Sequence, residues 1–202
     1  MKTESIATFL LLPFLFAASA TADDAAVSVV VTTTQGDITI ALYPEKAPVT
    51  VANFLRYVDG EHYDGASFYR VVTYENDNGA PKIEVIQGGL GDAESPFPPI
   101  AHETTKDTGL LHRDGVISMA RLEVGTASSE FFICIGDQPG LDHGAARYPD
   151  GQGFAAFGRV TAGMDIVIKI NKLEAGAPSD SAYTAGQILS EPVIIERIRR
   201  LD

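Results

Sequence analysis

The sequence contains a single cysteine, Cys134, among 202 residues, which excludes an intramolecular disulfide. A lone thiol can be a reactive nucleophile or a small packed residue in a strand. Nothing in the local sequence around Cys134 would lower the pKa of its thiol. We therefore interpret Cys134 as a packed residue.

Basic residues are also few, because 15 Lys and Arg stand against 27 Asp and Glu and give a formal net charge of −12. A deficit of this size argues against nucleic acid or an anionic membrane as the main partner. It favours a soluble, self-repelling surface, with a preference for basic client proteins as the alternative.

The sequence has one extended apolar run near its beginning, over residues 6–16, and this run is too short for a comfortable transmembrane span. Lys2 precedes the run and small residues follow it at positions 18–22. A charged start, an apolar middle and small residues at a cleavage site are typical of a secretory signal peptide.

We accordingly predict a signal peptide over residues 1–22, cleaved after Ala20 or Ala22, and a mature domain over residues 27–200. Such a protein would be periplasmic or secreted. No cysteine lies directly after the apolar run, which disfavours a lipid-anchored form. We expect the mature form to have no membrane contact.

Metal-binding and hydrolase motifs are missing as well. The four histidines (His62, His102, His112 and His143) do not fall at close metal-ligand spacings, so we expect no metal and no cofactor. The residue types of a hydrolase triad are present in Ser128, Ser129, Asp142 and His143. No Gly-x-Ser-x-Gly elbow accompanies them, so we do not favour a hydrolase.

Short segments of alternating apolar residues dominate the rest of the chain. They predict a hairpin over residues 27–42 and further strands over 67–72, 82–87, 116–120, 130–135, 155–160 and 193–198. Helical spacing predicts one helix from about Pro48 to Gly60 and another over residues 164–173. Many short strands with few helices indicate a mainly β domain, a barrel or a sandwich.

The segment over residues 130–135 is the most informative of these strands. Because strand side chains alternate, Phe131, Ile133 and Ile135 point one way, and Glu130, Phe132 and Cys134 point the other. If the first set is core, the second places an acidic group beside an aromatic ring in a groove. That pair suits a ligand with a polar backbone and an apolar ring.

Four blocks in this order resemble the cyclophilin-type peptidyl-prolyl cis-trans isomerases: SFYRVV (67–72), IQGG (86–89), ISMAR running on to SEFFI (117–133), and LDHG with FAAFGRV (141–160). The resemblance covers Val29 to Arg197. It implies a closed eight-stranded antiparallel β-barrel capped by two α-helices. It also implies an enzyme that accelerates rotation about X–Pro bonds.

X–Pro rotation has a barrier of about 18–20 kcal/mol and requires no nucleophile. A hydrogen-bond donor aimed at the proline nitrogen stabilises the twisted state more than the planar one. The resemblance assigns this catalytic role to Arg70. It assigns Gln87 to peptide contact and placement of the arginine, and the backbone of Ala120 and Arg121 to pairing with the extended peptide.

The resemblance also implies an apolar socket for the proline ring. Phe132 corresponds to its floor, Met119 and Leu141 to its lining and Phe154 to the rim. We expect Val85, which lies just before the IQGG block, to line the socket as well.

Glu130 departs from the family pattern, because many relatives have glutamine there. A carboxylate only accepts hydrogen bonds. Glu130 could pair with Arg70 or Arg121, or it could weaken the hold on a substrate carbonyl. Our hypothesis is that it orients Arg70.

Two further departures lie near the socket. Residues 73–82 form an extended polar loop, which either hangs over the socket or is an inert insertion. Gly140 stands where relatives often have an aromatic residue.

These observations predict an exported isomerase that assists the folding of other exported proteins. Its partners would be proline-containing peptides and unfolded exported proteins, with the enzyme itself a monomer. The alternative is a proline-peptide binding or chaperone module on the same fold with weak catalysis.

Overall fold

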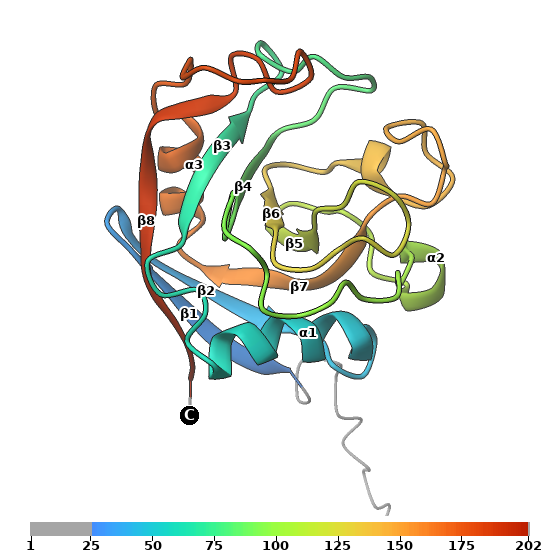
Figure 1. Ribbon diagram of the computed structural model, residues 1–202. Coiled ribbons are helices and arrows are strands. Elements are labelled where there is room, and N and C mark those ends of the chain that lie inside the picture. Colours follow the sequence, from blue (N-terminus) through green and yellow to red (C-terminus); the bar gives the residue numbers. More distant parts are fainter. Residues whose placement is uncertain (1–25, 202) are drawn as a thin grey trace, which may run out of the picture.

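The computed structural model describes residues 26–201, in which eight strands close into a barrel in the order β1-β2-β7-β5-β6-β4-β3-β8 (Figure 1). All neighbouring strands pair antiparallel. The strands are β1 (Val27–Thr33), β2 (Gly36–Leu42), β3 (Ser67–Val72), β4 (Val85–Gly89), β5 (Val116–Met119), β6 (Phe131–Cys134), β7 (Ala155–Ala162) and β8 (Ile188–Arg200). The closed eight-stranded barrel that the family resemblance implied is confirmed. The predicted signal peptide lies outside the described residues.

The first hairpin shows how alternation builds the barrel. Val31 pairs with Ile38, and the side chains of both are fully buried in the core. Gly36 has φ +134°, and a Cβ at this position would lie 2.8 Å from Cδ1 of Ile166. Glycine is therefore required where the second strand begins beneath a helix.

Two helices cover the opposite ends of the barrel (Figure 1). Helix α1 (Pro48–Asp59) inserts Phe54 among the core rings, with centroids 5.5 Å from Phe131 and 5.3 Å from Phe157. At the other end, Asn171 of α3 (Met164–Asn171) donates to the carbonyl of Val72, where β3 ends. A one-turn helix α2 (Thr105–Thr108) and a 3-10 turn η1 (Pro139–Leu141) lie in the connections.

Strand β4 begins at Val85, three residues later than the predicted start at Lys82. The amide of Ile83 donates to the carboxylate of Asp77 at 2.8 Å. That amide is not part of the strand ladder, because the side chain of Asp77 takes it.

Buried apolar residues form two clusters, one inside the barrel and one on its outer face. Phe131 and Ile133 belong to the inner cluster, whereas Phe132 and Cys134 belong to the outer one with Ile83, Val85 and Leu141. The predicted alternation of this strand is confirmed. Burial raises the pKa of the Cys134 thiol, which agrees with a packed rather than a reactive residue.

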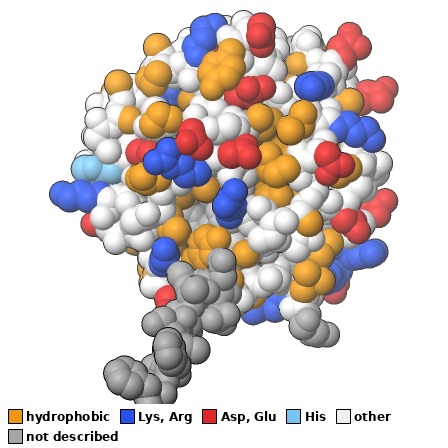
Figure 2. All heavy atoms as spheres, turned by 180° about the vertical axis from the view of Figure 1, so that it is seen from behind, with side chains coloured by type: hydrophobic (Ala, Val, Ile, Leu, Met, Phe, Trp, Pro, Cys, Tyr) orange, Lys and Arg blue, Asp and Glu red, His pale blue; other side chains and the backbone are white. Residues whose placement is uncertain are grey.

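The face shown in Figure 2 carries acidic and basic side chains intermingled, with hydrophobic side chains in small groups between them. The excess of acidic residues is not gathered into one patch on this face. No helix within residues 26–201 is long and apolar enough to cross a membrane.

Candidate functional site

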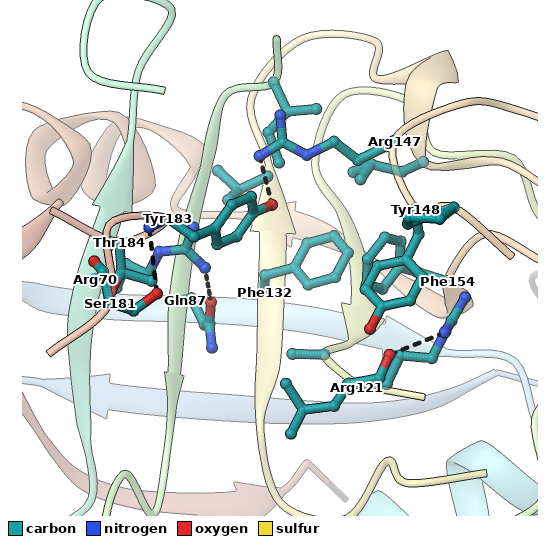
Figure 3. Close-up of a pocket in the computed structure, with 16 residues that line it drawn as sticks. Arg70, Gln87, Arg121, Phe132, Arg147, Tyr148, Phe154, Ser181, Tyr183 and Thr184 are labelled. Atoms are coloured by element: carbon teal, nitrogen blue, oxygen red, sulfur yellow. Dashed lines mark hydrogen bonds between the residues drawn. The ribbon is translucent and has the colours of Figure 1, made fainter. Parts of the chain in front are cut away.

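A cavity of about 770 Å³ opens over the outer apolar cluster (Figure 3). Phe132 lies at its centre and is 5 % exposed. The ring of Phe154 meets that of Phe132 edge-on, with centroids 5.5 Å apart. Ile83, Val85 and Leu141 complete the apolar part of the wall.

Eight of the ten predicted site residues line this one cavity, although they come from six separate parts of the chain. They are Arg70, Val85, Gln87, Ala120, Arg121, Phe132, Leu141 and Phe154. Met119 and Glu130 do not line it.

The prediction for Met119 is wrong because of strand alternation. Met119 is fully buried in the barrel core and pairs with Phe131. Its neighbour Ser118 instead faces the outer cluster, where its hydroxyl hydrogen-bonds His112 Nε2 at 2.9 Å.

A buried polar chain lies behind Phe132. The ring of His112 stacks against that of Phe132 with centroids 6.0 Å apart, and His112 Nδ1 lies 2.8 Å from Asp142. Together with Ser118 these groups resemble the triad of a hydrolase, but Ser118 is 0 % exposed and cannot reach a substrate. This hydrogen-bonded group therefore supports the phenyl ring of Phe132. The spacing of its three residues in the sequence did not predict that they meet.

Arg70 on β3 is held by two glutamines. Its Nη1 donates to Gln87 Oε1 at 2.8 Å, while Nε and Nη2 both donate to Gln187 Oε1, at 2.9 and 2.6 Å. Three of the five guanidinium N–H groups are used in this way. Burial, the largest influence, lowers the pKa of Arg70, and no carboxylate among the described residues pairs with it.

Gln187 was not predicted. It is fully buried immediately before β8, and its amide nitrogen donates to the carbonyl of Asn76 at 2.9 Å. A single glutamine in a polar segment carries no local signal for this contact with Arg70.

Arg121 is held in a different way. Its guanidinium donates twice to the carboxylate of Asp150, twice to the carbonyl of Gly153 and once to that of Leu122. All five N–H groups are satisfied. The hydrogen bonds from Arg121 hold the pKa of Asp150 below its usual value. The side chain of Arg121 is thus part of the wall and has no donor left for a ligand.

The backbone beside Arg121 is open to pairing. The amide of Ala120 donates to the carbonyl of Glu130. The carbonyl of Ala120 and the amide of Arg121 have no hydrogen-bond partner within residues 26–201. Next to them, Leu122 lines the cavity and is 76 % exposed.

A third arginine, Arg147, closes the far side of the cavity. It forms a bidentate ion pair with Asp77, with Nη1–Oδ2 at 2.7 Å and Nη2–Oδ1 at 2.8 Å, and both side chains are at most 1 % exposed. Nη2 also donates to the hydroxyl of Tyr183, whose ring lies 5.3 Å from Cζ of Arg70 (Figure 3). Tyr183 therefore stands between Arg70 and Arg147. Arg147, Asp77 and Tyr183 were not predicted from the sequence.

Burial alone would raise the pKa of Asp77. Hydrogen bonds from Arg147 and from the amides of Gly79 and Ile83 outweigh that effect, and the pKa falls below its usual value. The carboxylate is consequently ionised at neutral pH.

The loop over residues 73–82 contributes no lining residue to the cavity, and it is not inert. Figure 1 shows it beside the segment before β8, and Asn78 donates to the carbonyls of Tyr183 and Ala185 at 3.3 and 2.9 Å. The loop therefore supports the segment that carries Tyr183 and Gln187. The loop thus neither hangs over the socket nor is an inert insertion, which were the two positions expected from the sequence.

A residue larger than glycine does not fit at position 140, because Pro81 of the same loop occupies the space beside it. A Cβ on Gly140 would lie 2.5 Å from Cγ of Pro81. The loop thus occupies the space that a side chain at position 140 would need.

Glu130 contacts neither Arg70 nor Arg121, so the prediction of a direct pair is wrong. Its Oε2 accepts from the Tyr69 hydroxyl at 2.6 Å, and its Oε1 accepts from the amide of Gly91 and the hydroxyl of Ser129, both at 3.1 Å. Burial, the largest influence, raises the pKa of Glu130 above its usual value.

The cavity thus combines an aromatic floor, fixed arginine donors and an unpaired backbone edge. Within residues 26–201, no three potential metal-ligating side chains cluster together. Such an arrangement can hold an extended peptide, place an apolar ring on Phe132 and direct N–H donors at an adjacent atom.

Comparisons with known proteins agree with this arrangement. Residues 28–199 match the sequence model of the family described as cyclophilin type peptidyl-prolyl cis-trans isomerase/CLD. Peptidyl-prolyl cis-trans isomerase A of Dickeya dadantii is 35% identical over 172 residues, which are 83% of this chain and 81% of that protein. Peptidyl-prolyl cis-trans isomerase cyp18 of Streptomyces antibioticus is 36% identical over 174 residues, 84% of this chain and 95% of that protein.

The fold is similar to that of solved structures. A cyclophilin type peptidyl-prolyl cis-trans isomerase of Cryptosporidium parvum superposes with a TM-score of 0.66 at 22% identity, covering 88% of this chain and 98% of that chain. A second structure of the Cryptosporidium protein, in the presence of the dipeptide Ala-Pro, gives a TM-score of 0.64 at 21% identity, covering 87% of this chain and 99% of that chain.

Proposed function

The chain belongs to the cyclophilin-type peptidyl-prolyl cis-trans isomerase family, and on this premise we propose that it binds proline-containing peptides with the proline ring on Phe132 and Arg70 beside the X–Pro bond. The observation that carries the proposal is that Phe132 and Arg70 line one cavity and that Arg70 is held there by neutral amides. One structure of the Cryptosporidium relative is in the presence of the dipeptide Ala-Pro, a compound of the same chemistry.

The chemistry follows from how amide rotation redistributes electrons. When the X–Pro bond twists, resonance is lost and the proline nitrogen becomes pyramidal with a lone pair. The bonds to Gln87 and Gln187 leave one N–H of Nη1 and one of Nη2 of Arg70 for that lone pair. A donor that meets a lone pair present only in the twisted state lowers the barrier without tightening ground-state binding.

One side of the bond must be held while the other turns. The carbonyl of Ala120 and the amide of Arg121 are open to an extended peptide, which would pair with them as an added strand. Exposed Leu122 offers apolar contact to a neighbouring substrate residue. The open edge would thus fix the peptide on one side of the proline.

The cellular role in this proposal is folding of other exported proteins. It rests on the apolar run over residues 6–16 with small residues after it, which is typical of a signal peptide. Uncatalysed X–Pro exchange takes tens to hundreds of seconds, slow enough to limit folding. The enzyme would act as a monomer on unfolded chains. Mass spectrometry of the secreted protein tests the export step, and an intact Met1 would contradict it.

The activity is tested by isomerisation of a proline tetrapeptide with wild type, Arg70→Ala and Phe132→Ala. We expect wild type to be active, and both variants to lose at least about 100-fold in kcat/KM. Arg113→Ala is the control, because Arg113 is exposed in a surface ion pair and does not line the cavity. An inactive wild type that still binds the peptide would instead identify a proline-peptide binding or chaperone module.

A further inference from the structure

Arg70 is connected to Glu130 by an unbroken chain of hydrogen bonds. Arg70 Nη1 donates to Gln87 Oε1 at 2.8 Å, Gln87 Nε2 donates to the Tyr69 hydroxyl at 2.8 Å, and that hydroxyl donates to Glu130 Oε2 at 2.6 Å. We call these four residues the relay. It crosses from β3 to β4 and reaches the residue before β6, and its first bond is visible in Figure 3.

The two ends of the relay determine the orientation of its middle. Arginine can only donate hydrogen bonds, and an ionised carboxylate can only accept them. Gln87 must therefore turn its oxygen to Arg70, and Tyr69 must turn its proton to Glu130. Each neutral group then has a single arrangement, with charge-assisted bonds at both ends.

Both oxygens of Glu130 accept hydrogen bonds. Its second oxygen accepts from the amide of Gly91 and the hydroxyl of Ser129. Gly89 lies directly beneath it, since a Cβ there would come within 2.5 Å of Glu130 Oε1. The titratable groups that face the carboxylate are the phenols of Tyr69 and Tyr63, and no Lys, Arg or His among the described residues pairs with it.

We propose that Glu130 and Tyr69 are positioning residues, which act through Gln87 to hold the free donors of Arg70 toward the proline nitrogen. This inference rests on the proposed function, and it replaces the direct contact between Glu130 and Arg70 that the sequence suggested. Neither residue touches the substrate in this scheme, because neither lines the cavity.

The relay has a characteristic dependence on pH. Protonated Glu130 could donate as well as accept, so Tyr69 and Gln87 would lose their single orientation. Burial raises the pKa of Glu130, and turnover should therefore fall on the acid side at a pH above that at which an ordinary glutamate titrates. Because the substrate contacts are unchanged, kcat should fall more than KM rises.

The experiment compares wild type, Glu130→Gln, Tyr69→Phe and the double variant on a proline tetrapeptide across the acid and neutral range. We expect each single variant to lose about three- to tenfold in kcat at neutral pH with KM within about twofold. We also expect Glu130→Gln to lose the acid fall in turnover. The double variant should be no slower than the worse single one, because either substitution breaks the same chain.

Glu103→Gln is the matched control. Glu103 also accepts from backbone amides, of Val49 and Thr50 at 3.1 and 2.8 Å, but it has no connection to Arg70. Its turnover and its pH profile should equal those of wild type. A Glu130→Gln variant with wild-type or faster turnover, an unchanged acid fall, or additive losses in the double variant would overturn the proposal.

A second readout does not depend on catalysis. The side-chain amide resonances of Gln87 in NMR spectra should shift as Glu130 titrates, and this shift should vanish in Tyr69→Phe. If wild type proved inactive while the shift occurred, the proposed function would fail and the relay would stand. If the resonances did not respond in an active enzyme, the relay would fail and the function would stand.

Discussion

Arg70 and Arg121 lie on opposite sides of Phe132 in one cavity, and they are held in opposite ways (Figure 3). Arg121 has all five N–H groups satisfied and a carboxylate partner, Asp150. Arg70 has three N–H groups held by glutamine oxygens and no carboxylate partner. An arginine that is fully saturated and neutralised is structural, whereas one held by neutral amides keeps both charge and donors for a ligand.

Arg147 belongs with Arg121 in this comparison. Four of its N–H groups are used, and Asp77 neutralises it, while its buried Nε has no partner. The cavity therefore combines two arginines that build its wall with one that is available for chemistry.

The largest effect is expected where a structural arginine loses its carboxylate. Asp77→Ala leaves the guanidinium of Arg147 buried and unpaired, and should cost about 3–5 kcal/mol of unfolding free energy. Urea unfolding measures the loss. Turnover per folded molecule should fall far less than in variants of Arg70. Asp137→Ala is the control, because its ion pair with Arg113 is exposed and the unfolding midpoint should not move.

The same pair predicts a pH dependence of stability. The pKa of Asp77 is lower in the folded than in the unfolded protein. The ionised carboxylate therefore stabilises the folded state in full at pH values above its unfolded pKa, near 3.8. This stabilisation is lost as the pH falls through the pKa of Asp77 in the folded protein. The stability difference between wild type and Asp77→Asn should therefore narrow in this acid range. A difference that stayed constant throughout would contradict this account of the pair.

A smaller effect, on activity alone, is expected from Arg70→Lys. Lysine keeps the charge but lacks the planar fork that the two glutamines hold, and kcat/KM should fall about 100-fold. Arg121→Lys should do the reverse, with lower stability and nearly unchanged turnover per folded molecule. Isomerisation and unfolding assays on both variants test the comparison, which fails if the two substitutions have the same profile.

Gln187→Leu should have the smallest effect, because it frees Arg70 without removing it. The substitution deletes the acceptor of Nε and Nη2, and we expect kcat to fall about tenfold. Gln138→Leu is the matched control, since Gln138 is equally buried but donates to the carbonyl of Ile135. Equal losses of turnover in both variants would show that any buried glutamine matters and that Gln187 has no special role.

The sequence predicted those parts of the molecule that depend on local pattern. Phe131 and Phe132 were assigned to opposite faces correctly, because alternation is a property of any strand. Helix α1 followed from four apolar residues at helical spacing after Pro48. Met119 was misassigned from the family resemblance, because its side chain points into the barrel core, where it pairs with Phe131.

The partners of the three arginines could not be predicted in this way. Gln187 lies 117 residues from Arg70, and Asp77 lies 70 residues from Arg147. These contacts form only when the barrel closes and the loop over residues 73–82 meets the segment before β8. The sequence drew attention to Glu130, but the connection through Tyr69 and Gln87 required their places on three neighbouring strands or strand ends.

The sequence by itself determined the family, the barrel and half of the residues around the cavity, because these depend on short motifs and on the period of a strand or helix. The tertiary structure alone showed why Arg70 keeps free donors while Arg121 has none. Whether a guanidinium meets a carboxylate or an amide depends on groups that are distant in the chain, and the difference between Arg121 and Arg70 lies in those groups.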